Sequence, residues 1–224
     1  MPALSDYKSS PLTYGELARE IETLVLLWKN AGLKKGDKIA INARSSAAWA
    51  KLFYAAQAGG FVAVQIFNAF TPSDTVSLVN HSESRILYTE KPIFDKMNFD
   101  ELPELVAAID TRSGVLLASR GNFEELYATK DKAFEDSHAG GYGPDKVNFT
   151  PVELDDIAAI MYTSGSTGNP KGVMLANRNL SMNVYFLPTH VPFRRGENYV
   201  SILPYAHIFG MTVDMVAPLC YGMH

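Results

Sequence analysis

The first half of the chain alternates apolar runs with helical patterns, and this alternation limits the possible folds more than any other feature. Residues 39–42, 61–67 and 85–89 are apolar runs of strand length, and amphipathic helical patterns separate them. A strand that returns through a helix pairs in parallel with a neighbour in the same sheet. The sequence therefore predicts an α/β fold, with layered sheets flanked by helices.

Residues that favour helix ends occur where the helical patterns begin. Thr13 and Glu16 form a capping box, in which a hydroxyl and a carboxylate satisfy free N–H groups. Pro72 suits the first turn of a helix, and Asn177 suits an N-cap. We also expect strands at 105–110, 157–161, 173–175 and 198–203, helices at 17–28, 47–58, 123–128 and 178–187, and a helix that follows His207.

The periodic pattern disappears over residues 129–152, where turn formers gather at 137–144. The regular pattern resumes after an acidic turn at residues 154–156, just before the next expected strand. We therefore expect a first α/β lobe over residues 1–136, a linker over 137–152 and a truncated second region over 153–224.

Composition and charge exclude several classes of protein. The net charge of −4 and the lack of clustered Lys or Arg argue against a surface for nucleic acid or an anionic membrane. Cys220 is the only cysteine, which excludes an internal disulfide. The N-terminus lacks a signal-peptide pattern, and no apolar run approaches the roughly 18 residues of a membrane span. The five histidines lack the spacing of a zinc site, so we expect no metal ligands.

The segment from Tyr162 to Lys171 carries the strongest functional signal. Between two apolar runs it holds glycines, hydroxyl side chains and a lysine, which are Thr163, Ser164, Gly165, Ser166, Thr167, Gly168 and Lys171. Glycines let the backbone approach a ligand, consecutive N–H groups form an anion-binding nest, and hydroxyls and a lysine add donors. These features suit a polyphosphate, although a surface loop without a ligand has a similar composition.

A P-loop is the weakest alternative for this segment. That motif places a Ser or Thr hydroxyl directly after its lysine, whereas Lys171 lies between Pro170 and Gly172. The segment also lacks the Gly-x-Gly-x-x-Gly pattern of dinucleotide-binding folds.

Residues 163–172 resemble the AMP-binding signature of the adenylate-forming superfamily, which includes acyl-CoA synthetases, luciferases and adenylation domains. Residues 203–210 resemble the next motif of that family, and residues 11–17 with 36–41 resemble its opening helix and first strand. The resemblance therefore covers essentially the whole chain. The details are most similar to long-chain fatty acid–CoA ligases, except that residues 176–177 hold Ala-Asn in place of a common Thr-His.

The resemblance implies that residues 163–171 hold the β- and γ-phosphates of ATP, with Ser166, Thr167 and Lys171 in direct contact. It implies that His207 lies beside the acyl pocket and orients the substrate carboxylate. The implied reaction uses ATP, a fatty acid and CoA: the carboxylate attacks the α-phosphorus, pyrophosphate leaves, and CoA converts the acyl-adenylate to a thioester. Mg²⁺ would be held by the phosphates and by a glutamate in a later family motif.

Family members are much longer than 224 residues, and their hinge, metal-binding glutamate and catalytic lysine lie in motifs that this chain lacks. We therefore expect an N-terminal fragment that is inactive alone, and we assign no catalytic residue within it. Two alternatives stay open. One is an adenylation domain, or an aryl or short-chain ligase, of the same superfamily; the other is a non-catalytic module that binds a nucleotide or a partner. The expected location is the cytoplasm, with peripheral membrane association as the alternative for a fatty-acid enzyme.

Overall fold

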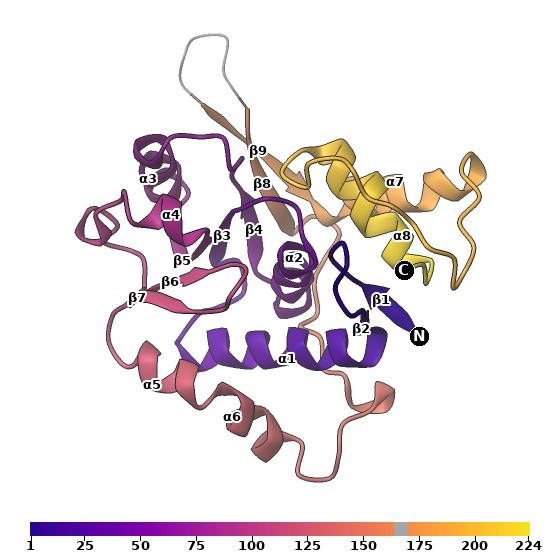
Figure 1. The fold of residues 1–224 in the computed structure, drawn as a ribbon, viewed down its shortest axis with the longest axis horizontal. Coiled ribbons are helices and arrows are strands. Elements are labelled where there is room, and N and C mark those ends of the chain that lie inside the picture. The colour runs from indigo at the N-terminus through magenta and orange to yellow at the C-terminus, as the bar shows by residue number, and fades with distance from the viewer. Residues whose placement is uncertain (164–169) are drawn as a thin grey trace.

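A mixed sheet forms the centre of the molecule in the computed structural model, which describes residues 1–163 and 170–224 (Figure 1). The strands of the described residues are β1 (Pro2–Leu4), β2 (Leu12–Thr13), β3 (Lys38–Asn42), β4 (Val62–Gln65), β5 (Ser84–Thr89), β6 (Ala107–Asp110), β7 (Leu116–Ser119), β8 (Ile157–Thr163) and β9 (Lys171–Ala176). The central sheet has the order β7-β6-β5-β3-β4-β8-β9, and β1 pairs separately with β2. The inner pairs from β6 to β8 are parallel, whereas β7 and β9 add to the two edges in antiparallel orientation.

Helices cover both faces of this sheet. The helices of the described residues are α1 (Tyr14–Asn30), α2 (Ala47–Gly59), α3 (Pro72–His81), α4 (Lys91–Phe94), α5 (Phe123–Ala128), α6 (Lys130–Ser137), α7 (Asn177–Phe186), the π-helix η4 (Gly210–Val216) and α8 (Ala217–Cys220). Short 3-10 turns occur at Phe99–Glu101, Pro144–Lys146 and Leu187–Thr189. α2 packs on one face with α1 outside it, and α3 covers the opposite face (Figure 1). The expected α/β fold is therefore confirmed.

The inner strands are apolar on both faces because helices bury both. Ile39 and Ile41 of β3 pack into the cluster that contains Trp28 and Trp49, on the side of α1 and α2. Ala40 lies between them in sequence and packs into the cluster on the side of α3. A parallel strand buried on both sides needs such a continuous apolar run, which is why these strands were predictable.

The chain reverses its direction across the sheet at β3, so the crossing point lies between the carboxyl ends of β3 and β5. The connection after β3 leads to β4 on one side, while the connection after β4 leads back past β3 to β5. Asn42 ends β3 at this point: its Nδ2 donates to the carbonyl of Phe67 at 2.9 Å, and the Thr89 hydroxyl at the end of β5 donates to its Oδ1 at 3.1 Å. In open α/β sheets, ligands bind at this kind of crossing point.

The predicted helix ends are confirmed for the first part of the chain. Thr13 is the N-cap of α1, and its capping box with Glu16 is complete. Thr71 is the N-cap of α3, with Pro72 in the first helical turn. These features depend on side chains a few residues apart, so sequence alone reveals them.

The predicted strand at 198–203 is wrong. The segment pairs with none of the described strands. The N–H groups of Ile202 and Leu203 donate to the Asp214 carboxylate at 2.9 and 2.8 Å. The Asp214 carboxylate accepts the hydrogen bonds that a neighbouring strand would otherwise accept.

Two local predictions in the second half also need correction. Residues 129–152 are not without pattern, because α6 forms there and buries Phe134 against Arg19 of α1. The helix α7 begins one residue earlier than expected, so Ala176 is its N-cap. Asn179 accepts the Ala176 N–H at 2.8 Å, while the Asn177 side chain donates to the carbonyl of Glu153.

β8 and β9 belong to the same sheet as the first strands, with β8 parallel to β4. The division into a lobe over 1–136, a linker over 137–152 and a region over 153–224 stays a prediction. Among the described residues, no helix is both long and apolar enough to cross a bilayer.

Candidate functional site

The strands β8 and β9 bring the two ends of the signature segment together. Thr163 ends β8, Lys171 begins β9, and the two residues pair directly across the antiparallel ladder. Both side chains are exposed. The predicted contacts Ser164, Gly165, Ser166, Thr167 and Gly168 lie outside the described residues. The segment thus starts at the carboxyl end of β8, which pairs with β4 in the central sheet.

A pocket of about 390 Å³ lies next to this hairpin and contains a second predicted residue. Its lining residues are Phe67, Ala69, Phe70, Tyr162, Thr163 and His207. The strand order explains this grouping, because β4 and β8 are parallel neighbours and the residues after β4 therefore stand beside the end of β8. The structure places Thr163 and His207 at one pocket; the molecules that they bind stay a prediction.

His207 sits in a tight turn that fixes which ring nitrogen faces outward. The Phe209 N–H donates to its Nδ1 at 3.2 Å, and its own backbone N–H donates to the carbonyl of Pro204 at 3.1 Å. With Nδ1 acting as an acceptor, the proton of the neutral ring resides on Nε2. The exposed His207 ring can therefore offer an Nε2–H donor to an anionic group.

The turn depends on Gly210. A Cβ at this position would lie 2.3 Å from the carbonyl oxygen of Pro204. No side chain fits in that space, so the backbone can fold back closely only with glycine.

Residues 203–210, here called the His207 motif, pack against the N-terminus of α2. The Tyr205 ring packs on Trp49 with ring centroids 5.4 Å apart. The Tyr205 N–H donates to the Ser45 hydroxyl at 2.9 Å, and that hydroxyl donates to the carbonyl of Leu203. These contacts connect the motif to the buried scaffold and set the position of His207.

Sequence reasoning missed the aromatic walls of the pocket, which are Phe67, Phe70 and Tyr162. The signal for Phe67 and Phe70 was their place directly after a buried parallel strand that ends at the sheet edge. No local pattern showed that β8 would lie beside β4, so the pocket itself was not predictable.

The donors around the pocket suit an anion more than a metal ion. Thr163 and His207 supply a hydroxyl and a ring N–H, and Lys171 stands opposite Thr163. The described lining contains no carboxylate. Over residues 1–163 and 170–224, no three His, Cys, Asp or Glu side chains gather in a way that would hold a metal ion.

Several known proteins are similar to this chain in sequence. The whole chain, residues 1–224, matches the sequence profile of the family described as AMP-binding enzyme. It is 30% identical over 211 residues to a chloroplastic long-chain-fatty-acid–[acyl-carrier-protein] ligase of Arabidopsis thaliana, covering 88% of this chain and 28% of the relative. It is 29% identical over 225 residues to the sulfoacetate–CoA ligase of Cupriavidus necator, covering 98% of this chain and 40% of the relative.

The fold is also that of a solved structure. The ATP-bound crystal structure of MatB from Rhodopseudomonas palustris superposes with a TM-score of 0.77 at 22% identity, covering 99% of this chain and 41% of that one. The chain therefore spans well under half of the length of each of these proteins.

Proposed function

Because the chain belongs to the family of AMP-binding enzymes, we propose that it is the N-terminal, ATP-binding part of an AMP-forming acyl-CoA ligase. The observation that carries this proposal is the grouping of Thr163 and His207 at one pocket, with Lys171 paired to Thr163 across the hairpin. A hydroxyl and a ring N–H line the pocket, and a cation stands next to the hydroxyl in the ladder. Such donors, fixed in advance, favour the negative charge that develops during phosphoryl chemistry.

Each described residue has a distinct part in this proposal. Lys171 contacts the β- or γ-phosphate of ATP, and the Thr163 hydroxyl donates to the same group. His207 donates its Nε2–H to the substrate carboxylate, which is already ionised at neutral pH and needs no general base. The remaining proposed phosphate contacts, Ser164, Gly165, Ser166, Thr167 and Gly168, lie outside the described residues.

In the proposed reaction, the carboxylate oxygen attacks the α-phosphorus of ATP, and pyrophosphate leaves with the bond to the β-phosphate. The thiolate of CoA then attacks the acyl carbon and releases AMP. When Mg²⁺ is bound, it neutralises charge on the phosphates. The described pocket offers no carboxylate to hold Mg²⁺, so we derive no step through the metal.

For the acyl substrate we propose a long-chain fatty acid. The similarity to a long-chain-fatty-acid ligase supports this substrate, while the similarity to a sulfoacetate–CoA ligase supports a short polar acid. Pyrophosphate release by the longer ligase that includes this chain, measured with palmitate, acetate, benzoate and sulfoacetate, separates these classes. Release with palmitate alone supports the long-chain assignment, and release with another acid alone overturns it. Cytoplasmic or membrane-surface location belongs to the same proposal and is tested by cell fractionation.

Calorimetric titration of this polypeptide with ATP tests the site itself. Lys171 is exposed, so Lys171→Ala leaves the fold intact. We expect this variant to bind ATP about tenfold or more weakly, since a hydrogen bond to a charged group contributes roughly 1.5–3 kcal/mol. Lys34→Ala, at an exposed lysine before the amino end of β3, is the matched control and keeps the original affinity. Equal affinity in the Lys171 variant, or no ATP binding by the unaltered chain, overturns the proposal.

A further inference from the structure

Tyr162 is buried in β8 although it directly precedes the exposed Thr163, and its hydroxyl reaches α3. Tyr162 Oη and His81 Nδ1 lie 2.7 Å apart and share a hydrogen bond. Their rings meet edge to face, with centroids 5.7 Å apart. Burial raises the pKa of the Tyr162 phenol, so the hydroxyl stays protonated, and it also lies 3.4 Å from the carbonyl oxygen of Leu78, to which it can donate.

The ring of Tyr162 also holds the partner strand. Tyr162 pairs with Gly172 across the hairpin. A Cβ at Gly172 would lie 3.3 Å from Cε1 of Tyr162 and 3.2 Å from Cγ2 of Ile160. Glycine therefore leaves the space in which the tyrosine ring lies against β9, as an aromatic ring does when it covers a cross-strand glycine.

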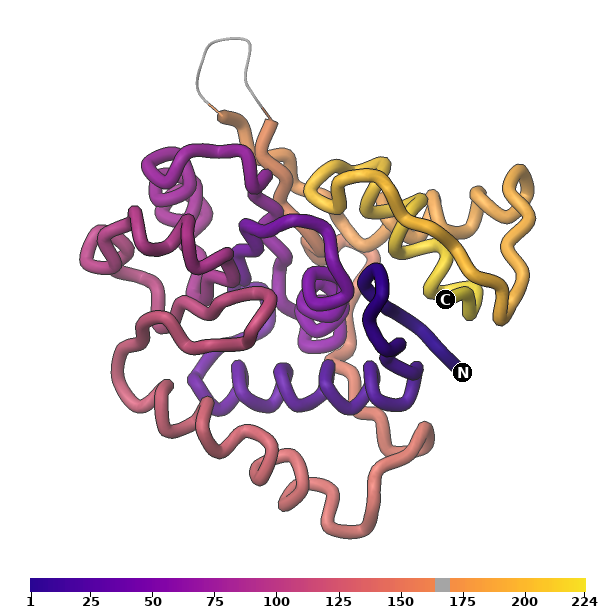
Figure 2. The backbone as a smooth tube through the Cα atoms, viewed as in Figure 1, coloured from indigo at the N-terminus to yellow at the C-terminus, as the bar shows by residue number. Residues whose placement is uncertain are grey.

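The other end of this contact is an exposed residue on a packed helix. His81 occupies the last turn of α3, a helix fixed to the sheet by the buried Leu78 and Val79. β8 and β9 run between α3 and the C-terminal segment that carries His207 (Figure 2). A bond from α3 to Tyr162 therefore adds an attachment beyond the pairing of β8 with β4, which ends at Met161.

This attachment at Tyr162 is one residue from the proposed site. Thr163 and Lys171 form the next pair along the ladder beyond Tyr162 and Gly172. Tyr162 is itself a wall of the pocket that contains Thr163 and His207. A shift of the Tyr162 ring would move Thr163 and Lys171 together and would change the shape of the pocket.

We propose that His81 is a positioning residue for the nucleotide site: through its hydrogen bond to Tyr162 it sets where Thr163 and Lys171 stand relative to His207. This inference rests on the proposed function, since the ligand is the triphosphate of ATP. His81 touches no ligand itself and acts only through the tyrosine. The simpler explanation is that the bond merely contributes to folding stability.

Three variants separate these explanations. Tyr162→Phe keeps the ring and removes the hydroxyl, and His81→Leu removes the ring nitrogen. His81→Asn restores a polar atom near the place of Nδ1, and we expect it to rescue function. Tyr185→Phe, at an exposed tyrosine of α7, is the matched control. ATP affinity is measured by calorimetry under conditions in which urea titration shows every variant folded, and amide exchange is followed at residues 160–163 and 171–173.

We expect Tyr162→Phe and His81→Leu to weaken ATP binding about fivefold, the effect of losing one net hydrogen bond, and to speed exchange at both strand ends. His81→Asn and Tyr185→Phe should stay near the original affinity. Unchanged ATP affinity in the folded Tyr162→Phe and His81→Leu variants overturns the positioning role. If the unaltered chain binds no ATP, the proposed function is overturned independently of the positioning role. The role of His81 is then judged from amide exchange alone, and unchanged exchange at residues 171–173 in the variants overturns it.

Discussion

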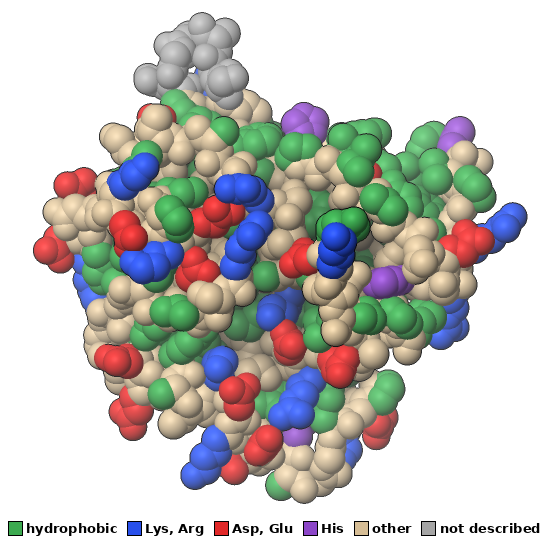
Figure 3. Space-filling view, in the orientation of Figure 1, with side chains coloured by type: hydrophobic (Ala, Val, Ile, Leu, Met, Phe, Trp, Pro, Cys, Tyr) green, Lys and Arg blue, Asp and Glu red, His purple; other side chains and the backbone are tan. Residues whose placement is uncertain are grey.

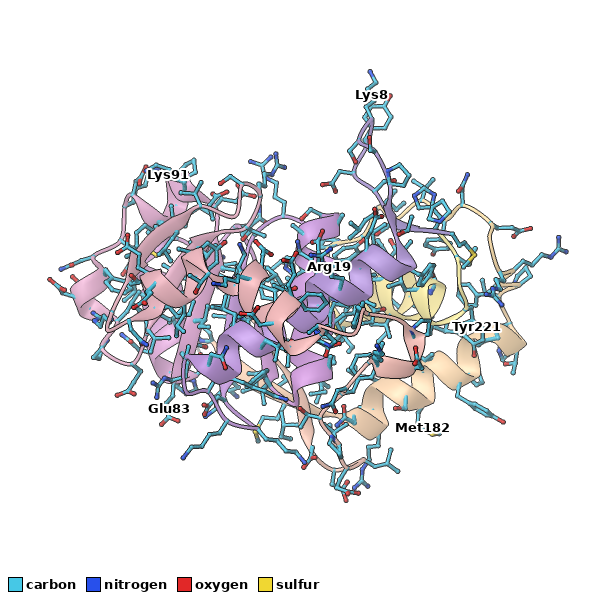
Figure 4. All side chains as sticks on the ribbon, turned by 90° about the horizontal axis from the view of Figure 1, so that it is seen from below. Lys8, Arg19, Glu83, Lys91, Met182 and Tyr221 are labelled. Carbon is cyan, nitrogen blue, oxygen red and sulfur yellow. The ribbon has the colours of Figure 1, made fainter. Side chains whose placement is uncertain are left out.

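The buried scaffold and the region that carries the candidate site differ in how completely they are packed. In β3 and β4 every residue from Ile39 to Asn42 and from Val62 to Gln65 is buried. In β9 and α7 the large side chains are mostly exposed, including Met174 at 67% and Met182 at 68%. Met182 lies on the outer side of α7, at the periphery of the molecule (Figure 4). The site is therefore attached to a firm core and is not part of it.

The surfaces of the two regions differ in the same way. Apolar side chains gather over α7 and α8, whereas acidic and basic side chains are mixed over α1, α5 and α6 (Figure 3). Besides the pairing of β8 with β4, side-chain contacts join the regions, among them the hydrogen bond of Tyr162 to His81, the bond from the Gln57 amide to the carbonyl of Ala158 at 2.9 Å, and the ion pair of Lys35 with Asp156 at 2.7 Å. Stability should therefore depend mostly on the buried scaffold, while ATP binding should depend on how these contacts position the site.

The largest expected effect is in the scaffold. Trp28 is fully buried, packs edge to face on Phe61 and donates its Nε1–H to Tyr88 Oη at 3.2 Å. Trp28→Ala should lower the free energy of unfolding in urea by about 3–5 kcal/mol, through lost burial and a residual cavity. Tyr185→Ala, 80% exposed on α7, should change it by less than about 0.5 kcal/mol. Comparable losses for the two variants would contradict the contrast between the regions.

A smaller effect is expected at the turn that holds His207. Gly210→Ala places a Cβ against the carbonyl oxygen of Pro204 and should cost about 1–3 kcal/mol of unfolding free energy by overpacking. The control is Gly15→Ala in the first turn of α1, where a Cβ meets nothing within 4 Å. That substitution should stabilise the chain by up to about 1 kcal/mol. If both alanines have the same sign of effect, the close approach at Gly210 does not control the turn.

The smallest effect concerns acid stability of the scaffold edge. Burial opposes ionisation of Asp110, but donors from Ser113, Lys91 and Arg112 outweigh it and lower its pKa. Because its pKa is lower in the folded chain, the Asp110 carboxyl binds a proton more readily in the unfolded chain. The ionised carboxylate therefore contributes its full stabilisation above the unfolded pKa of about 3.9. That contribution is lost as the pH falls through the lower folded pKa. In Asp110→Asn the stability curve should lack that slope, which is at most about 1.4 kcal/mol per pH unit. An identical acid profile in the variant, measured by urea unfolding from pH 5 to pH 2, would show that Asp110 is not responsible.

Local features of this sequence predicted local structure well. The capping box of Thr13 and the Thr71-Pro72 pair identified helix starts because the partners are only a few residues apart. The apolar runs identified β3, β4 and β5 because helices bury both faces of the parallel strands. β7 gave no such signal, since its four residues are only half-buried and its place depends on antiparallel pairing with β6.

The candidate site was only partly predictable for the same reason. Thr163, Lys171 and His207 stood out by their residue types and by resemblance to a family. Their partners Phe67, Phe70 and Tyr162 come together only because β8 inserts beside β4. The contact between His81 and Tyr162 joins residues that are distant in sequence, and no local pattern indicates it.

The central claim is that the triphosphate of ATP lies against Lys171, at the end of the β8–β9 ladder where Lys171 pairs with Thr163. An acyl-phosphate derivative of ATP tests it directly, because such a probe transfers its acyl group to a lysine beside the bound phosphates. Peptide mass spectrometry should find Lys171 acylated, and excess ATP should suppress the labelling. Labelling of Lys51 or Lys130, which line a separate cavity between α1 and the β6–β7 turn, with Lys171 left unmodified, would contradict the account.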